Sequence, residues 1–196
     1  MMLSKLTSLL VAGLLPVLAV AAPAEAATAK RSAACGNTQE VPASGNLAGV
    51  ERATLCLLNA ERGERDLRPL QSNWRLSRAA ERHTEDMVEH RYFAHDSRNG
   101  SSFSDRIRAT GYLSRVGSWV VGENLAWGSG RLGSAEAIVR AWMSSPGHRA
   151  NVLSGRYREI GIGMTLGSPR GGAGATYATE FGAVTRRATA SQRIRR

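Results

Sequence analysis

One of the four histidines lies in a setting that keeps an imidazole neutral. The stretch SSPGHRAN, residues 144–151, predicts a helix that begins at Pro146, with Ser145 as its N-cap. His148 then lies in the positive field of the helix start, which disfavours the imidazolium form. A neutral imidazole can bind a metal ion or accept a proton. The simpler alternative is a hydrogen bond to a loop.

Other polar and aromatic residues have plainer interpretations. His83 shares an apolar helical face with Leu76 and Met87, which predicts a hydrogen-bonded core histidine, and His90 suits the polar end of the same helix or an approach to His95. Glu180 lies in a strand pattern and could supply a further carboxylate to a site. The tryptophans are expected to pack in the core and in cleft walls: Trp74, Trp119, Trp127 and Trp142.

Covalent catalysis has little support in the sequence. Neither H-E-x-x-H nor G-x-S-x-G occurs, so neither a familiar zinc protease nor a serine hydrolase of that type is expected. Cys35 and Cys56 are predicted to form a disulfide, because an even cysteine count in an exported chain favours a bridge.

The N-terminus predicts export. Lys5 precedes an apolar run, residues 6–22, and Ala24-Glu25-Ala26 is a cleavage pattern, which together indicate a signal peptide over residues 1–26. Gly13 and Pro16 interrupt the run, which is short for a membrane span. The protein is therefore expected outside the cytoplasm, in the periplasm or beyond, without a transmembrane anchor.

The compact domain is expected at residues 49–184, after a leader at 27–48 and before a basic tail at 185–196. The tail holds five arginines, which is half of the net charge of +10, and could bind an anionic wall polymer or lipid headgroups. Nucleic acid is not an expected partner, because aromatic residues are few and no known binding module occurs.

Hydrophobic periodicity predicts an α+β domain. Helical spacing occurs near residues 50–63, 74–90, 103–109 and 135–143, and strand patterns occur near 118–127, 159–167 and 176–184. The glycine-rich loop between the last two strands favours an antiparallel sheet with helices packed on it.

Several motifs in order resemble the CAP superfamily, the cysteine-rich secretory, antigen 5 and pathogenesis-related proteins. The resemblance covers about Glu51–Val184 and is similar to the bacterial secreted SCP-like branch. It is carried by LNAERGERDLRPL (58–70), YFAHDS (92–97), GENLA (122–126), Trp142, SSPGHRAN (144–151) and YATEFGA (177–183). It implies an α-β-α sandwich with a small central antiparallel sheet and an open cleft.

The same resemblance implies a site of two histidines and two acids. His95, Glu123 and His148 match three of these positions, and Ser145 stands where the second acid is expected. Two imidazoles and one carboxylate could hold Zn²⁺ with an open position, or act as acid and base around a water molecule.

Three functions follow as expectations. The first is an extracellular binding protein with a divalent-metal site at His95, Glu123 and His148. The second is a hydrolase of peptide or cell-wall material that uses the same residues as catalytic groups. The third, which rests on the resemblance alone, is a module that binds lipid or sterol between helices.

Overall fold

The computed structural model describes residues 33–114 and 116–186. The predicted signal peptide, the first part of the leader and the tail from residue 187 onward lie outside the described residues. Within the described part, helices and strands are mixed along the chain, and the last two strands follow each other directly.

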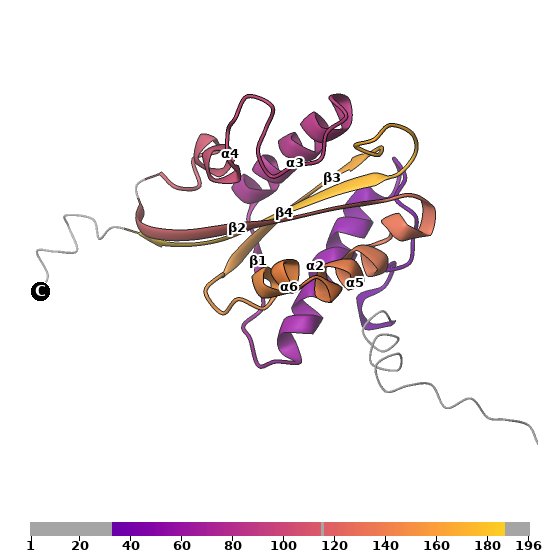
Figure 1. Cartoon of the computed structure of the whole chain (residues 1–196). Coiled ribbons are helices and arrows are strands. Elements are labelled where there is room, and N and C mark those ends of the chain that lie inside the picture. The colour runs from indigo at the N-terminus through magenta and orange to yellow at the C-terminus, as the bar shows by residue number, and fades with distance from the viewer. Residues whose placement is uncertain (1–32, 115, 187–196) are drawn as a thin grey trace, which may run out of the picture.

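A four-stranded sheet forms the centre of the molecule, in the order β1-β3-β4-β2 (Figure 1). The strands are β1 (Gln71–Ser72), β2 (Val116–Gly128), β3 (Glu159–Leu166) and β4 (Ala175–Arg186). β4 pairs antiparallel with both β2 and β3, as the glycine-rich loop predicts. The short β1 is an addition to the expected antiparallel sheet, because it pairs parallel with β3.

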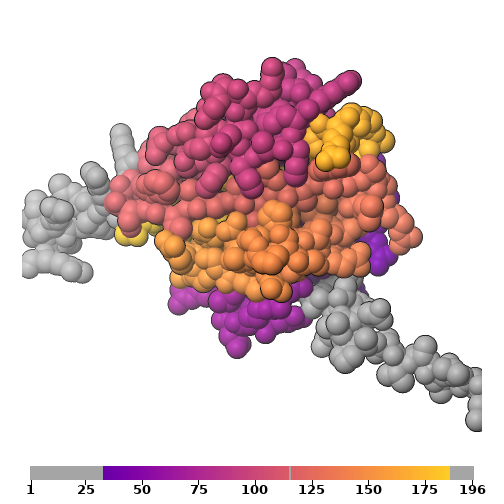
Figure 2. Space-filling model, viewed as in Figure 1, coloured from indigo at the N-terminus to yellow at the C-terminus, as the bar shows by residue number. Residues whose placement is uncertain are grey.

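Helices cover both faces of this sheet. On one side lie α3 (Trp74–Glu89) and α4 (Phe103–Ala109). On the other side lie α2 (Leu47–Gly63), α5 (Ala135–Ser144) and α6 (Pro146–Val152) (Figure 1). Figure 2 shows the segment around α4 above β2, and α5 and α6 below it. The predicted α-β-α sandwich is confirmed.

Each face of the sheet has its own apolar core. Leu57, Trp142 and Phe181 belong to the larger core, between the sheet and the helices α2 and α5. On the opposite face, α3 lies directly against β3. A Cβ atom at Gly161 would lie 1.9 Å from the backbone nitrogen of Ser77, and one at Gly163 would lie 2.2 Å from that of Glu81. Glycine is therefore required at both positions, and the distance between α3 and the sheet is fixed.

The predicted disulfide between Cys35 and Cys56 is present, with an S–S distance of 2.01 Å. It links the segment that precedes α2 to the middle of that helix. Closing this loop restricts the unfolded chain, so we expect the double variant Cys35→Ala/Cys56→Ala to lose about 3 kcal/mol of unfolding free energy. Urea denaturation measures the loss, and reduction of the wild-type protein should reproduce it. A loss below about 1 kcal/mol in both cases would contradict the prediction.

Candidate functional site

Glu123 is a buried carboxylate in the middle of the sheet. It lies on β2, directly opposite Glu180 on β4, and its side chain is only 1 % exposed. Its neighbour Gly122 lets the strand approach Tyr157, since a Cβ atom there would lie 2.2 Å from the tyrosine hydroxyl. Burying a charge in this way is costly unless it is paired and hydrogen-bonded, so the groups around Glu123 define the site.

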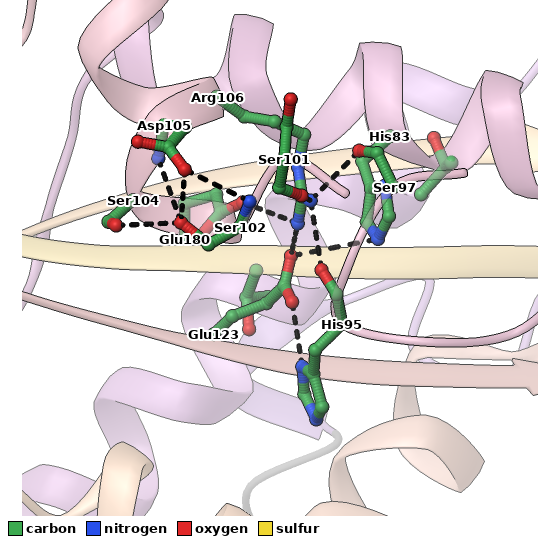
Figure 3. A network of polar contacts seen from close by, with 12 residues as sticks. His83, His95, Ser97, Ser101, Ser102, Ser104, Asp105, Arg106, Glu123 and Glu180 are labelled. Carbon is green, nitrogen blue, oxygen red and sulfur yellow. Dashed lines mark hydrogen bonds and ion pairs between the residues drawn. The ribbon is translucent and has the colours of Figure 1, made fainter. Parts of the chain in front are cut away.

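Two cationic or polar groups hold the two oxygens of this carboxylate (Figure 3). His95 Nδ1 lies 2.7 Å from Glu123 Oε1, and Arg106 Nη2 donates to Oε2 at 2.5 Å. Burial alone would raise the pKa of Glu123, but the hydrogen bond from His95 and the positive charge of Arg106 outweigh it and hold the pKa below its usual value. Glu123 is therefore ionised at neutral pH.

His95 comes from the loop between α3 and α4 and points its ring at Glu123 (Figure 3). Its side chain remains 55 % exposed, so one edge of the ring is bound to the carboxylate while Nε2 is open to solvent. The hydrogen bond to Glu123 raises the pKa of His95 above its usual value, although partial burial opposes this. The structure thus brings together two of the three residues that the sequence indicates.

Arg106 is a part of this site that the sequence analysis missed. Its Nη1 donates to the His95 carbonyl at 2.8 Å and to Ser97 Oγ at 3.1 Å, while Nη2 reaches Glu123. One guanidinium therefore fixes the loop that carries His95 and neutralises the carboxylate that His95 contacts. The available signal was an arginine within the short helix α4, behind a capping box formed by Ser102 and Asp105.

Glu180 is the second carboxyl group of the site and is fully buried. Its pKa is raised well above its usual value by burial and by the negative charge of Glu123, and neither of its oxygens has a hydrogen-bond partner among the described residues. Burial beside an ionised carboxylate therefore favours the neutral form of Glu180. Arg106 Nη2 lies 3.8 Å from Glu180 Oε1, too far for a hydrogen bond.

His83 is a hydrogen-bonded core histidine, as predicted. Its Nε2 lies 2.9 Å from the Ala94 carbonyl, which accepts and so places the proton on Nε2. Burial, followed by the nearby charge of Arg106, lowers its pKa, so the ring is neutral. The sequence did not indicate that this nitrogen also lies 4.0 Å from Glu123 Oε2. His90 pairs with Asp86 at 2.9 Å and is not part of the site.

The helix that carries His148 begins at Pro146 with Ser145 at the N-cap, as predicted, but the serine side chain makes no capping hydrogen bond. Among the described residues, the His148 ring has no hydrogen-bond partner. Its pKa is lowered by partial burial and then by the positive charge of His95. The ring is therefore neutral and close enough to His95 to sense its charge.

Two asparagines join the start of α6 to β2 beside Glu123. Asn124 Nδ2 donates to the His148 carbonyl at 3.0 Å, and Asn151 Nδ2 donates to the Glu123 carbonyl at 3.0 Å. At the other end of α6, the buried Arg62 donates to the Val152 carbonyl at 2.7 Å. The backbone that carries His148 is thus held at both ends.

The contacts favour Glu123 as the partner of a metal-binding histidine over Glu123 as a ligand. Both of its oxygens already accept hydrogen bonds, and Arg106 already neutralises its charge. Over residues 33–114 and 116–186, no group of three or more His, Cys, Asp or Glu side chains could hold a metal ion. A carboxylate that orients a ligating imidazole from behind is common at metal sites, and this arrangement leaves Nε2 of His95 free.

The tryptophans do not all pack as expected. Trp142 is buried, and its Nε1 donates to the Leu125 carbonyl at 3.1 Å. Trp74 is 65 % exposed, so the prediction that it packs in the core is wrong. Trp119 is 46 % exposed and lines a surface pocket, which agrees with a place in a wall rather than in the core. Trp74 lies instead beneath the Arg75 guanidinium, 4.5 Å from the ring centroid.

The three-layer sandwich, with Glu123 on its central sheet and His95 in a loop above it, agrees with the family that the sequence motifs resemble. The chain belongs to the cysteine-rich secretory protein (CAP) family, whose model matches residues 55–180. None of the helices among the described residues has the length and apolar character needed to cross a membrane.

Two Bacillus subtilis proteins are similar in sequence. The uncharacterized protein YkwD is 32 % identical over 154 residues, which are 73 % of this chain and 57 % of that protein. The uncharacterized membrane protein YlbC is 32 % identical over 114 residues, 58 % of this chain and 31 % of that protein. The chain therefore spans only part of the length of each of these relatives.

Solved structures share the fold at low sequence identity. An extracellular protein with an SCP domain from Bacillus anthracis has a TM-score of 0.56 and 22 % identity, over 76 % of this chain and 45 % of that one. An outer surface protein of Borrelia burgdorferi has a TM-score of 0.56 and 20 % identity, over 68 % of this chain and 90 % of that one. These similarities establish the architecture.

Proposed function

We propose that the protein is a secreted binding protein whose site is formed by His95, Glu123 and His148, and that the two imidazoles bind a divalent cation such as Zn²⁺. The observation that carries this proposal is the 2.7 Å contact between His95 Nδ1 and the buried Glu123. It orients the ring and leaves Nε2 exposed. His148 supplies a neutral imidazole, the form that binds metal.

Calorimetric titration with Zn²⁺ tests the metal part. We expect His95→Ala and His148→Ala each to weaken binding about tenfold or more, because removing one of two ligands leaves a single imidazole. His90→Ala is the matched control, since His90 is partly exposed and pairs with Asp86 outside the site. Absence of zinc binding to the wild-type protein, or an equal loss in the control, would exclude the cation.

Hydrolysis is the second candidate, because an exposed histidine backed by a buried carboxylate is also the arrangement of a general base. Assays on casein and on peptidoglycan, with and without zinc, separate the two functions. Turnover that is lost in His95→Ala would establish the hydrolase, and no turnover under either condition would leave the binding protein.

Lipid or sterol binding between helices has less support. The pocket between α2 and α5, lined by Leu57, Val139 and Met143, has a volume of about 160 Å³. Pockets that enclose drug-sized ligands usually measure about 300–1,000 Å³.

A further inference from the structure

A second polar pocket lies on the α3 and α4 side of Glu123. It has a volume of about 400 Å³ and is lined by residues from α3, from the loop that follows His95 and from α4: Arg82, His83, Asp86, Ser97, Arg98, Asn99 and Arg106. Three of these residues are arginines and one is an acid. The acid is already occupied, because Asp86 accepts from the Tyr92 hydroxyl and pairs with His90 at 2.9 Å.

The two outer arginines have no partner. Within residues 33–114 and 116–186, the exposed side chains of Arg82 and Arg98 make neither a hydrogen bond nor an ion pair. They come from different segments, the helix α3 and the loop before α4, yet they line the same pocket. Two unpaired guanidinium groups on one concave surface favour an oxyanion, because each can donate two parallel hydrogen bonds to it.

The inner wall adds one unsatisfied donor and one unsatisfied acceptor. Arg106 Nε is buried and has no hydrogen-bond partner in the described part of the chain, and the same holds for His83 Nδ1. The proton of His83 is on Nε2, which donates to the Ala94 carbonyl, so Nδ1 carries a lone pair. Buried polar atoms without partners are rare in proteins, and both of these belong to residues that line the pocket.

We propose that this pocket binds a phosphate monoester, with Arg82, Arg98 and Arg106 on the anionic oxygens and His83 Nδ1 accepting from a protonated phosphate oxygen. A monoester or inorganic phosphate near neutral pH presents both kinds of oxygen, whereas sulfate has no hydroxyl to donate. This site shares Arg106 with the surroundings of Glu123, but it does not use the imidazoles of His95 and His148 and does not depend on a metal ion.

Calorimetric titration of the purified protein with inorganic phosphate tests the site. We expect saturable binding that the double variant Arg82→Gln/Arg98→Gln weakens about tenfold or more, because hydrogen bonds to charged groups contribute that much each. The matched control is Arg68→Gln/Arg156→Gln, which removes the same charge from two exposed arginines outside the pocket and should change binding less than about twofold. Sulfate should bind several times more weakly than phosphate.

Two further probes distinguish the sources of such a group. Glycerol 3-phosphate represents a soluble monoester, and phosphatidylcholine vesicles that contain phosphatidic acid represent a lipid headgroup. Weaker binding of a probe by the Arg82→Gln/Arg98→Gln variant than by the control variant identifies that probe's source, the soluble monoester or the lipid headgroup, as the ligand. Absence of phosphate binding, equal losses in both double variants, or sulfate binding as tight as phosphate would overturn the proposal.

Discussion

Replacing Arg106 with methionine is expected to lower the free energy of unfolding by about 3–5 kcal/mol, because it leaves the buried Glu123 charge without its cationic partner. Arg106 is only 10 % exposed and donates to Glu123 Oε2 at 2.5 Å. The same substitution frees the His95 loop, since Arg106 Nη1 also donates to the His95 carbonyl. Chemical denaturation near neutral pH measures the loss.

The control for this variant lies two residues away on the same helix. Arg108 is 57 % exposed and pairs with Asp105 at 2.9 Å, so Arg108→Met should cost less than about 1 kcal/mol. The double variant Arg106→Met/Glu123→Gln should recover part of the stability, because the uncompensated charge is then absent. Equal losses for Arg106→Met and Arg108→Met would show that Glu123 does not depend on this partner.

Replacing Glu180 with glutamine is expected to remove a steep dependence of stability on pH. The pKa of Glu180 in the folded protein is raised well above its ordinary 4.5 by burial and by the Glu123 charge. Between pH 4.5 and the higher pKa of the folded state, folded Glu180 keeps a proton that the unfolded chain has released. The contribution of Glu180 is therefore full below pH 4.5 and is lost, at up to about 1.4 kcal/mol per pH unit, as the pH rises toward the folded pKa.

Denaturation of both proteins at a series of pH values between about 5 and 8 measures this difference. Glu180→Gln keeps a neutral donor beside Glu123, so it should be close to the wild type at pH 5 and more stable at pH 8. Other groups also have shifted pKa values, among them the imidazoles of His95 and His148, which are present in both proteins. The pKa of Glu51 is raised to about 7, first by burial, and that of Glu123 is lowered. Glu51 is unchanged in the variant, whereas Glu123 loses its interaction with the Glu180 carboxyl group. Parallel stability curves for the two proteins would refute the raised pKa of Glu180.

The sequence predicts the architecture well because the signals for it are local and repetitive. Apolar residues recur with the helical period along α3, and this pattern forms its buried face in the structure. The period of two along β3 correctly predicts a strand, although residues 160–164 are buried on both faces. The bridge between Cys35 and Cys56 needed only their number and the expected compartment. The contact between His95 and Glu123 came from short motifs whose order matched that of a known family.

The remaining parts of the site depend on register and on the path of a loop. Glu180 faces Glu123 only because β4 pairs with β2 in one specific alignment, and a shift by one residue would have moved it to the other face of the sheet. Arg106 reaches the carboxylate because the loop from residue 91 to 102 folds back over it. Exposure of Trp74 and Trp119 likewise depends on where α3 and β2 meet neighbouring elements, which residue type alone does not determine.

The two imidazoles are held in unlike ways. The helix that carries His148 is bonded to β2 through Asn124 and, at its other end, to α2 through Arg62, whereas His95 belongs to a loop that one guanidinium retains. Ligand binding should therefore restrict the motion of the His95 loop and leave the helix of His148 unaltered. Amide hydrogen exchange would slow around residues 95–101 and stay constant along α6, so the loss of conformational entropy on binding would fall on one side of the site.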